Sequence, residues 1–379
     1  MRILVAPDSF KGTLKAKEVA EVIEKGIRKV FPEAKVIKVP LADGGEGTVE
    51  ALVGAVGGRI LTREVTSPLG EKIEASFGIL SEGATAVIEM AQASGLSLVP
   101  PRKRNPLITT TFGTGELIKA ALDEGCKKII IGIGGSATID GGVGMAQALG
   151  AQFLDREGKE IGFGGGSLGE IVSINMEHFD PRVKKVKVVV ASDVNNPLCG
   201  EKGAAKVYGP QKGADEKMVK ILEDNMAHFA QMIKKFLGKD VRDIPGAGAA
   251  GGLGAGLIAF MDAEIKSGAE IIMEASHLEE KMKGVDLVIS GEGRIDEQTL
   301  YGKVPLRVLK IAKKRNIPLV LIGGEVKEKG ILYKEGVSAI VSCVDQILPL
   351  DKALKNARTN LMNASEQTMR LIKLGCFLR

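Results

Sequence analysis

Short apolar runs alternate with longer amphipathic stretches at both ends of the chain. Each run is a few residues long and consists mostly of Val, Ile and Leu, as in the buried strands of a parallel sheet. The stretches between the runs repeat apolar residues at helical spacing. Because a strand, a helix and a second strand form the unit of a parallel sheet, this alternation indicates α/β structure. We predict strands at 3–6, 35–39, 287–289, 319–322 and 339–342, and helices near 15–30, 46–55, 302–314 and 352–374.

This alternation breaks down in the middle of the chain. β-Rich stretches at about 59–66, 71–79 and 84–90 lie too close together for crossover helices, so we expect antiparallel pairing there. Two further apolar runs, 128–132 and 186–191, are typical of buried parallel strands. The stretch 216–237 repeats apolar residues at helical spacing. The middle of the chain therefore predicts a mixed sheet.

The two patterns imply two domains. The chain has 379 residues, which is more than a single domain usually contains, since a domain usually has about 150 residues. We expect an α/β protein in which two α/β domains face a cleft. The first is a discontinuous, Rossmann-like domain with a parallel sheet, built from residues 1–58 plus 287–379. The second is an inserted α/β domain with a mixed sheet, residues 59–286.

Composition narrows the class of protein. The net charge of +5 comes from 52 basic and 47 acidic residues scattered along the chain, unlike the clustered basic face of a nucleic-acid binder. The four cysteines show no C-x-x-C spacing, and no stretch reaches the ~18 apolar residues of a membrane span. The first residues enter a strand without a signal peptide. We expect a cytoplasmic protein acting on small molecules, with no nucleic-acid or membrane partner. A homo-oligomer is left open.

Five apolar runs end in a loop of glycine and acidic residues. The carboxyl ends of parallel strands meet at one edge of a sheet, where α/β proteins bind their ligands. Glycines there let backbone N–H groups approach an anion, and carboxylates hold a cation or take a proton. The loops therefore predict an active site for a polyanionic substrate handled with a metal. They comprise residues 5–11, 40–48, 132–142, 191–197 and 290–296.

Three familiar motifs give negative or weak signals. No G-x-x-x-x-G-K-[S/T] occurs, which excludes a Walker loop. Residues 246–251 satisfy G-x-G-x-x-G, but no clear strand precedes them, so a close-packed loop leading into a helix is the better interpretation. Residues 165–169 match G-x-S-x-G, again without a strand before the serine.

The loop residues suit phosphoryl transfer, which requires donors around the phosphates, Mg²⁺ on carboxylates and a base beside the accepting hydroxyl. One loop offers N–H groups and hydroxyls to an anion, and a helix starting near Asp140 would add its positive end. The loop residues are Gly134, Gly135, Ser136 and Thr138. Candidate carboxylates for the metal or the proton are Asp43, Glu46, Asp193 and Asp296. Candidate cations for phosphate or a substrate carboxylate are Lys11, Lys212, Arg294 and Lys303. Any single acid here could instead be an N-cap or turn residue.

At these positions the chain resembles the bacterial glycerate kinase family, the type without a Walker loop. The matching segments occur in order along nearly the whole chain. They are A-P-D-S-F-K-G at 6–12, P-L-A-D-G-G-E-G-T at 40–48, G-I-G-G-S-A-T at 132–138, 192–194 with 196–198, 209–214, 248–254, and 290–294 with Asp296, 298–299 and 302–303. One departure is Ile139, because family members often carry Asn at this position.

The resemblance implies transfer of the ATP γ-phosphoryl group to D-glycerate with Mg²⁺, to give a phosphoglycerate that we expect to be 2-phosphoglycerate. On the matched positions we assign Asp193 as the base, Arg294 to the glycerate carboxylate, and Asp296 to the substrate or metal. Lys11 and Lys212 are assigned to phosphate. The expected nucleotide-binding residues are Gly134, Gly135, Ser136, Thr138, Asp140, Lys212, Asp8 and Ser9, and the expected metal ligands are Asp43, Glu46 and Glu292. A kinase for another small hydroxy acid, or a non-catalytic sensor of nucleotide or sugar acid, remains an alternative.

Overall fold

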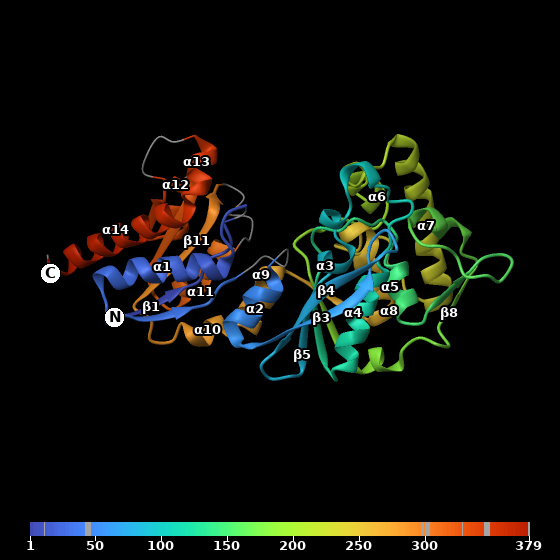
Figure 1. The fold of residues 1–379 in the computed structure, drawn as a ribbon, viewed down its shortest axis with the longest axis horizontal. Coiled ribbons are helices and arrows are strands. Elements are labelled where there is room, and N and C mark those ends of the chain that lie inside the picture. Colours follow the sequence, from blue (N-terminus) through green and yellow to red (C-terminus); the bar gives the residue numbers. More distant parts are fainter. Residues whose placement is uncertain are drawn as a thin grey trace. The chain divides into compact units, whose positions relative to one another are not determined.

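The chain folds into two compact units (Figure 1). The computed structural model describes residues 1–10, 12–41, 47–296, 299, 304–327, 329–344 and 349–377. Unit 1 comprises Met1–Asp43, Glu50–Gly57 and Ala269–Arg379, and unit 2 comprises Gly44–Val49 and Gly58–Gly268. The expected boundary at 286/287 does not coincide with the boundary between the units, which lies at 268/269. The difference arises because the segment after residue 268 packs with unit 1, where Lys281 Nζ donates to the carbonyl of Ala55 at 2.8 Å.

Unit 1 is built on a five-stranded sheet in which every pair is parallel. The strand order is β13-β12-β11-β1-β2. The strands are β1 (Arg2–Val5), β2 (Lys35–Lys38), β11 (Leu287–Ile295), β12 (Leu319–Val326) and β13 (Ala339–Ser342). The prediction of one parallel sheet from both chain ends is confirmed. In chain order this is the flavodoxin-like arrangement 2-1-3-4-5, whose connections reverse direction between β1 and β11.

The helices of unit 1 follow the amphipathic stretches. In α1, buried residues recur at Val19, Ile23, Ile27 and Val30, so one face packs on the core. Gly26 on the same face lets α14 approach closely, because a Cβ there would lie 2.6 Å from the Ser365 Cβ. Figure 1 shows the two helices side by side. The helices are α1 (Ala16–Val30), α2 (Thr48–Val56), α9 (Gly268–Ala275), α10 (Leu278–Lys281), α11 (Val304–Lys314), α12 (Lys329–Glu335), α13 (Leu350–Lys355) and α14 (Ala357–Phe377).

Unit 2 is built on a six-stranded mixed sheet of order β10-β9-β6-β5-β4-β3. Its strands are β3 (Gly58–Thr66), β4 (Lys72–Leu80), β5 (Thr85–Glu89), β6 (Lys128–Gly132), β9 (Lys187–Ala191) and β10 (Glu264–Lys266). The pairs β3–β4 and β4–β5 are antiparallel, and β5, β6, β9 and β10 are parallel neighbours. The predicted mixed sheet is therefore confirmed. The three-residue strand β10 and the small hairpin of β7 (Gln152–Leu154) and β8 (Ser173–Asn175) were not predicted.

The helices of unit 2 enclose a core that includes Phe77, Leu117 and Phe229, all with no exposed surface. The predicted helix at 216–237 is α7, which Asp215 caps by accepting from the Met218 N–H at 2.8 Å. The helices are α3 (Ala91–Ser94), α4 (Phe112–Asp123), α5 (Val143–Ala148), α6 (Ala204–Tyr208), α7 (Glu216–Leu237) and α8 (Leu253–Met261). No described helix in either unit is long and apolar enough to cross a membrane.

The glycine run at 246–251 forms a tight connection into α8. The sequence analysis predicted such a loop because no clear strand precedes residue 246. Gly251 has a φ of +69°, and a Cβ at this position would lie 1.8 Å from the carbonyl oxygen of Thr138. The run therefore supports the loop that carries Thr138, and it does not have the strand that a dinucleotide-binding loop requires.

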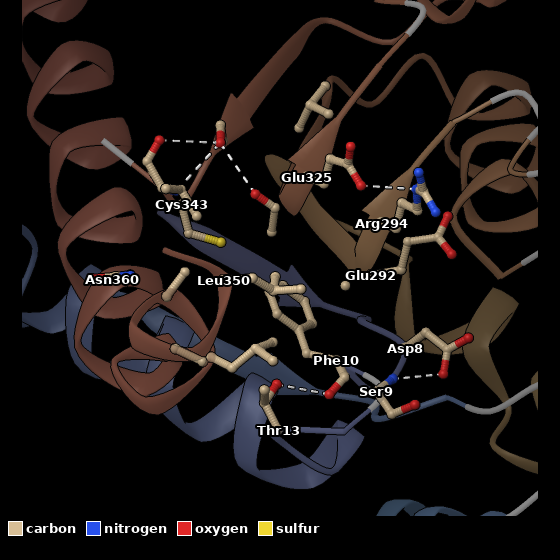
Figure 2. A pocket seen from close by; sticks show the side chains of 18 of the residues that line it. Asp8, Ser9, Phe10, Thr13, Glu292, Arg294, Glu325, Cys343, Leu350 and Asn360 are labelled. Atoms are coloured by element: carbon tan, nitrogen blue, oxygen red, sulfur yellow. Dashed lines mark hydrogen bonds and ion pairs between the residues drawn. The ribbon is translucent and has the colours of Figure 1, made fainter. Parts of the chain in front are cut away.

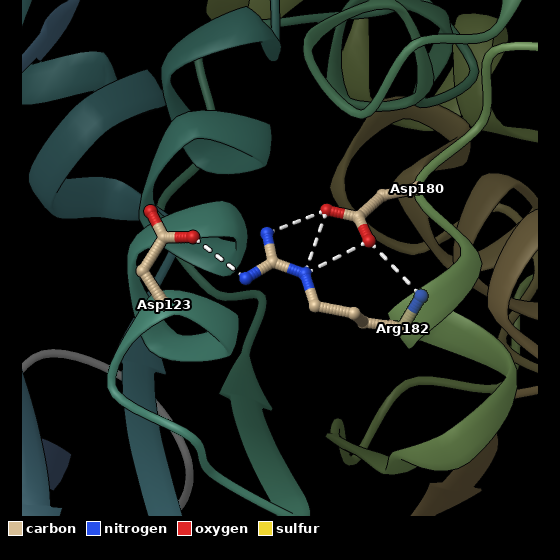
Figure 3. Close-up of polar contacts among 3 residues, drawn as sticks. All are labelled: Asp123, Asp180 and Arg182. Atoms are coloured by element: carbon tan, nitrogen blue, oxygen red, sulfur yellow. Dashed lines mark hydrogen bonds and ion pairs between the residues drawn. The ribbon is translucent and has the colours of Figure 1, made fainter.

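An ion-pair group ties the segment before β9 to α4 (Figure 3). Arg182 donates from Nη2 to Asp180 at 2.7 Å and from Nη1 to Asp123 at 2.7 Å. Asp180 also accepts from the backbone N–H of Arg182 at 3.0 Å. Hydrogen bonds from the Arg182 side chain hold the pKa of the Asp180 carboxyl below its ordinary value.

Candidate active site

A cavity of about 900 Å³ lies at the carboxyl ends of the unit 1 strands. It is formed where β1, β11, β12 and β13 end, and it includes the point between β1 and β11 at which ligands bind in this sheet order. Its other wall comes from α13 and the start of α14. Figure 2 shows the charged side chains of Asp8, Glu292 and Arg294 to one side of the cavity and Cys343 and Leu350 to the other.

Carboxylates from neighbouring strands meet in this cavity. Asp8 follows β1, and Glu292 and Asp296 lie on or after β11. Asp8 and Glu292 are 5% and 6% exposed. The Asp8 carboxylate accepts from the Ser9 N–H at 2.6 Å, and Glu292 accepts from the Thr299 hydroxyl at 2.7 Å. The structure therefore brings together Asp8, Ser9, Glu292 and Asp296, which the sequence analysis selected separately.

Arg294 lies on β11 opposite Glu325 of β12. Its Nε is 2.9 Å from a Glu325 oxygen and 3.4 Å from an Asp296 oxygen (Figure 2 shows the Glu325 pair). Arg294 is the only cation among the described lining residues, against the carboxylates of Asp8, Glu292, Asp296 and Glu325. The described wall is thus net acidic, so a polyphosphate would enter it together with a divalent cation.

The chemistry of this wall suits Mg²⁺. The described residues contain no group of three or more His, Cys, Asp or Glu side chains arranged to hold a metal by themselves. Mg²⁺ in phosphate-transferring proteins is usually held by one or two carboxylates, waters and the phosphates, so the acidic oxygens of Asp8, Glu292 and Asp296 are sufficient in kind. Lys11, Asp43, Glu46 and Lys303 lie outside the described residues.

The glycine loop after β6 forms a second group in unit 2. Gly134 and Gly135 are exposed, and Gly135 has a φ of +76°, which favours glycine. Beside them, Lys212 Nζ donates to the Ser136 hydroxyl at 2.6 Å and to the Thr138 carbonyl at 2.7 Å. Lys212 is 2% exposed, and burial lowers the pKa of its ammonium to about 7. Exposed backbone groups of the loop thus lie beside a buried cation that a distant segment of the chain supplies.

Thr138 supplies a further sign that this loop is built for a ligand. Its hydroxyl oxygen is buried and has no hydrogen-bond partner within the described part of the chain. Buried hydroxyls normally have a partner, so such a group points to an occupant that completes the site.

Asp140 does not occupy the position expected of a nucleotide ligand. Its carboxylate is 1% exposed and accepts from the Thr111 N–H at 2.7 Å and the Thr111 hydroxyl at 2.8 Å. It also accepts from the N–H groups of Gly142 and Gly144, at 3.2 and 3.3 Å. Burial raises the pKa of the Asp140 carboxyl, and these donors oppose the rise. Asp140 therefore joins the starts of α4 and α5 and positions the loop from within.

Asp193 lies just past the end of β9 and is exposed. Since β6 and β9 are parallel neighbours, with Gly132 opposite Ala191, Asp193 and the glycine loop leave the same edge of the unit 2 sheet. Among the described residues, none pairs with its carboxylate. Asp193 is thus available to a ligand at this edge.

Several lining residues of the unit 1 cavity were not selected from the sequence. Glu325 follows Gly323-Gly324 at the end of an apolar run, so the pattern of glycine and acid that marked the other loops was also present there. Cys343, Leu350 and Asn360 carry no such signal, because only folding places β13, α13 and α14 beside the charged end of the cavity.

A flavodoxin-like sheet with carboxylates at its switch point, together with a glycine loop on a second α/β sheet to which a buried lysine donates, defines a phosphotransferase-like protein without a Walker loop. The family model described as the glycerate kinase family matches residues 3–373. The chain belongs to this family, and the resemblance found in its loop motifs is confirmed.

The relatives match over their full length. Glycerate 2-kinase of Escherichia coli (strain K12) is 52% identical over 376 residues, which cover 99% of both chains. Glycerate kinase of Bacillus subtilis (strain 168) is 52% identical over 376 residues, covering 99% of this chain and 98% of the relative. A crystal structure described as glycerate kinase 2 from Salmonella typhimurium LT2 superposes with a TM-score of 0.92 at 48% identity, covering 99% of each chain.

Proposed function

We propose that this protein transfers the γ-phosphoryl group of ATP to the 2-hydroxyl of D-glycerate, with Mg²⁺, to give 2-phosphoglycerate and ADP. One observation carries the proposal: the chain is 52% identical, across 99% of both chains, to a relative named glycerate 2-kinase. The fold adds the groups that phosphoryl transfer needs, on the loops where an α/β protein binds ligands.

In this proposal the unit 1 cavity receives the metal-bound nucleotide. Asp8, Glu292 and Asp296 would hold Mg²⁺ together with the phosphate oxygens, and the ion would neutralise charge on the transferring group. Asp43 and Glu46 stay predicted ligands. Arg294, oriented by Glu325, offers the cavity a cation for an anionic part of a ligand.

The unit 2 loop is proposed to bind an anionic substrate group. The N–H groups of Gly134 and Gly135, the Ser136 hydroxyl and the Lys212 ammonium are donors of the required kind. Lys212 is held at the loop by its bonds to Ser136 and Thr138, which makes it a fixed donor. A fixed donor loses little freedom when an anion arrives.

Asp193 is proposed as the general base. As the glycerate 2-oxygen bonds to the γ-phosphorus, the bond to the bridging oxygen breaks, the hydroxyl proton passes to the Asp193 carboxylate and ADP leaves. The carboxylate is exposed and has no partner among the residues that the structure describes, which supports the role, since a base must reach the substrate hydroxyl.

Phosphorus NMR of a reaction with ATP, Mg²⁺ and D-glycerate tests the proposal and distinguishes the 2-phosphate from the 3-phosphate. We expect 2-phosphoglycerate from the wild type and, with Asp193→Asn, a loss of rate of about a hundredfold or more. Asp215→Asn, which alters a capping residue of α7 instead, is the matched control and should keep most activity. A 3-phosphate product would refute the regiochemistry, and absence of product would refute the proposed substrate.

A further inference from the structure

The unit 1 cavity is larger than a three-carbon hydroxy acid requires. Cavities of about 300–1,000 Å³ enclose ligands of drug size, and this one measures about 900 Å³. The strand-end carboxylates and Arg294 account for only one side of it (Figure 2). The remaining volume has room for a ligand that extends well beyond a metal-bound phosphate.

The side of the cavity away from the charges is apolar. Leu350 and Leu354 line it from α13, and they are 74% and 46% exposed. Phe10, 4% exposed, and Cys343 complete this surface from the ends of β1 and β13. The Cys343 thiol donates to the carbonyl of Gly323 at 3.0 Å, and burial raises its pKa to about 12, so it contributes an uncharged surface. Two exposed leucines on a cavity wall favour a ligand with an apolar face.

Asn360 of α14 places one polar group beside this apolar surface (Figure 2). Within the described part of the chain, no residue hydrogen-bonds its side-chain amide. A carboxamide presents a donor and an acceptor in one plane, the pattern that Asn uses to pair with the edge of adenine. An apolar ring with such an edge is a purine base.

We infer that the end of the unit 1 cavity formed by Phe10, Cys343, Leu350, Leu354 and Asn360 is the subsite for the purine ring of the nucleotide. The base packs against α13 and pairs with the Asn360 amide, and the phosphates extend toward Asp8 and Glu292 with the divalent cation. This inference rests on the proposed use of ATP. It adds which end of the cavity holds the base and which residues select it.

The test compares probes with and without a base on the full-length protein. Calorimetry gives the Kd of Mg-ATP and Mg-ADP, and competition against ATP gives the affinities of adenosine and of Mg-tripolyphosphate. Leu354→Asp should weaken ATP, ADP and adenosine by about tenfold or more and leave tripolyphosphate unchanged. Asn360→Ala should weaken the same three by about tenfold and reduce the preference for ATP over GTP. KM for ATP should rise with kcat and KM for glycerate unchanged.

Leu371→Asp is the matched control, because Leu371 is a 69% exposed leucine of α14 that does not line the cavity. Thermal unfolding midpoints of all variants check that folding is unaffected, which is expected because Leu354 and Leu371 are exposed and no described residue hydrogen-bonds the Asn360 side-chain amide. Equal weakening of tripolyphosphate would overturn the assignment, because the variants would then act on the phosphates or on the whole cavity. Unchanged ATP affinity would also overturn it, and a simultaneous change in sedimentation would show that a second copy of the chain covers α13.

Failure of this inference is distinct from failure of the proposed function. A wild type that phosphorylates glycerate while both cavity variants bind ATP normally refutes only the base subsite. A wild type that neither binds ATP nor forms product refutes the function itself.

Discussion

Lys212 provides the sharpest test of the site, because the structure makes its ammonium unfavourable for stability. The side chain is 2% exposed, and burial lowers its pKa from 10.5 to about 7. The difference, 10.5 minus 7, corresponds to about 5 kcal/mol at about 1.4 kcal/mol per pH unit. We therefore predict that Lys212→Met impairs the kinase reaction and yet stabilises the protein at pH 6.

The size of the stabilisation follows from two opposing effects. The substitution relieves the cost of a buried charge, at most about 5 kcal/mol, but leaves the Thr138 carbonyl without its donor, which costs about 1–3 kcal/mol. The net gain at pH 6 should be about 2–4 kcal/mol.

The sign of the pH dependence is set by proton uptake. Between pH 7 and 10.5 the unfolded lysine binds a proton that the folded one does not, so wild-type stability rises with pH in this window. The methionine variant lacks this rise. Its advantage should therefore shrink by up to about 1.4 kcal/mol per pH unit above pH 7 and be lost between about pH 8.5 and about pH 10.

Urea unfolding of both proteins from pH 6 to 10, followed by circular dichroism, measures this difference directly. Lys212→Arg serves as a comparison. Arginine keeps its charge throughout this pH range, so the stability of this variant should not rise with pH as that of the wild type does. A stability difference between wild type and Lys212→Met that does not vary from pH 7 to 10 would refute the reasoning, as would full activity of the methionine variant.

Three further substitutions test the scaffold of the site. Asp140→Asn should destabilise the protein by about 1–3 kcal/mol, since an amide NH₂ would face backbone donors, and denaturant unfolding at pH 7 measures the loss. Gly251→Ala should cost about 3 kcal/mol and lower kcat, because the added Cβ would lie 1.8 Å from the Thr138 oxygen; unchanged stability and rate would contradict that geometry. Asp180→Asn should cost at most about 1 kcal/mol of stability at pH 7, because it removes the ion pair with Arg182. The difference in stability from the wild type should vanish as the pH falls below 3.8, because the wild-type carboxylate then becomes protonated. Denaturant unfolding measured at a series of acidic pH values tests this expectation.

The sequence predicted most strands of both sheets because each is a short apolar run bounded by turn residues. β11 is an informative exception. It was expected at 287–289 but continues to Ile295, because its later residues pair with β12 as far as Val326. Glu292 and Arg294 therefore lie on a strand, two positions apart on one face of the sheet, and this is what directs both toward the cavity.

The C-terminal helix is a second element whose bounds the sequence pattern did not reveal. A single helix was expected near 352–374, but the chain breaks at Asn356 into α13 and α14. Helical spacing continues across the break, so periodicity alone does not reveal it. The break places Leu354 and Asn360 on the wall of the cavity.

The sequence by itself determined the α/β class, the mixed and parallel sheets, the family and the kinds of group at the strand ends, because these depend on local pattern and on motifs. Only the tertiary structure decided that Asp140 is an interior acceptor, since its donor Thr111 is 29 residues away. It also decided that Lys212 is a buried cation, bonded to a loop 74 to 76 residues away. Burial and hydrogen bonding set the charge and availability of a side chain, and both depend on which distant segments pack around it.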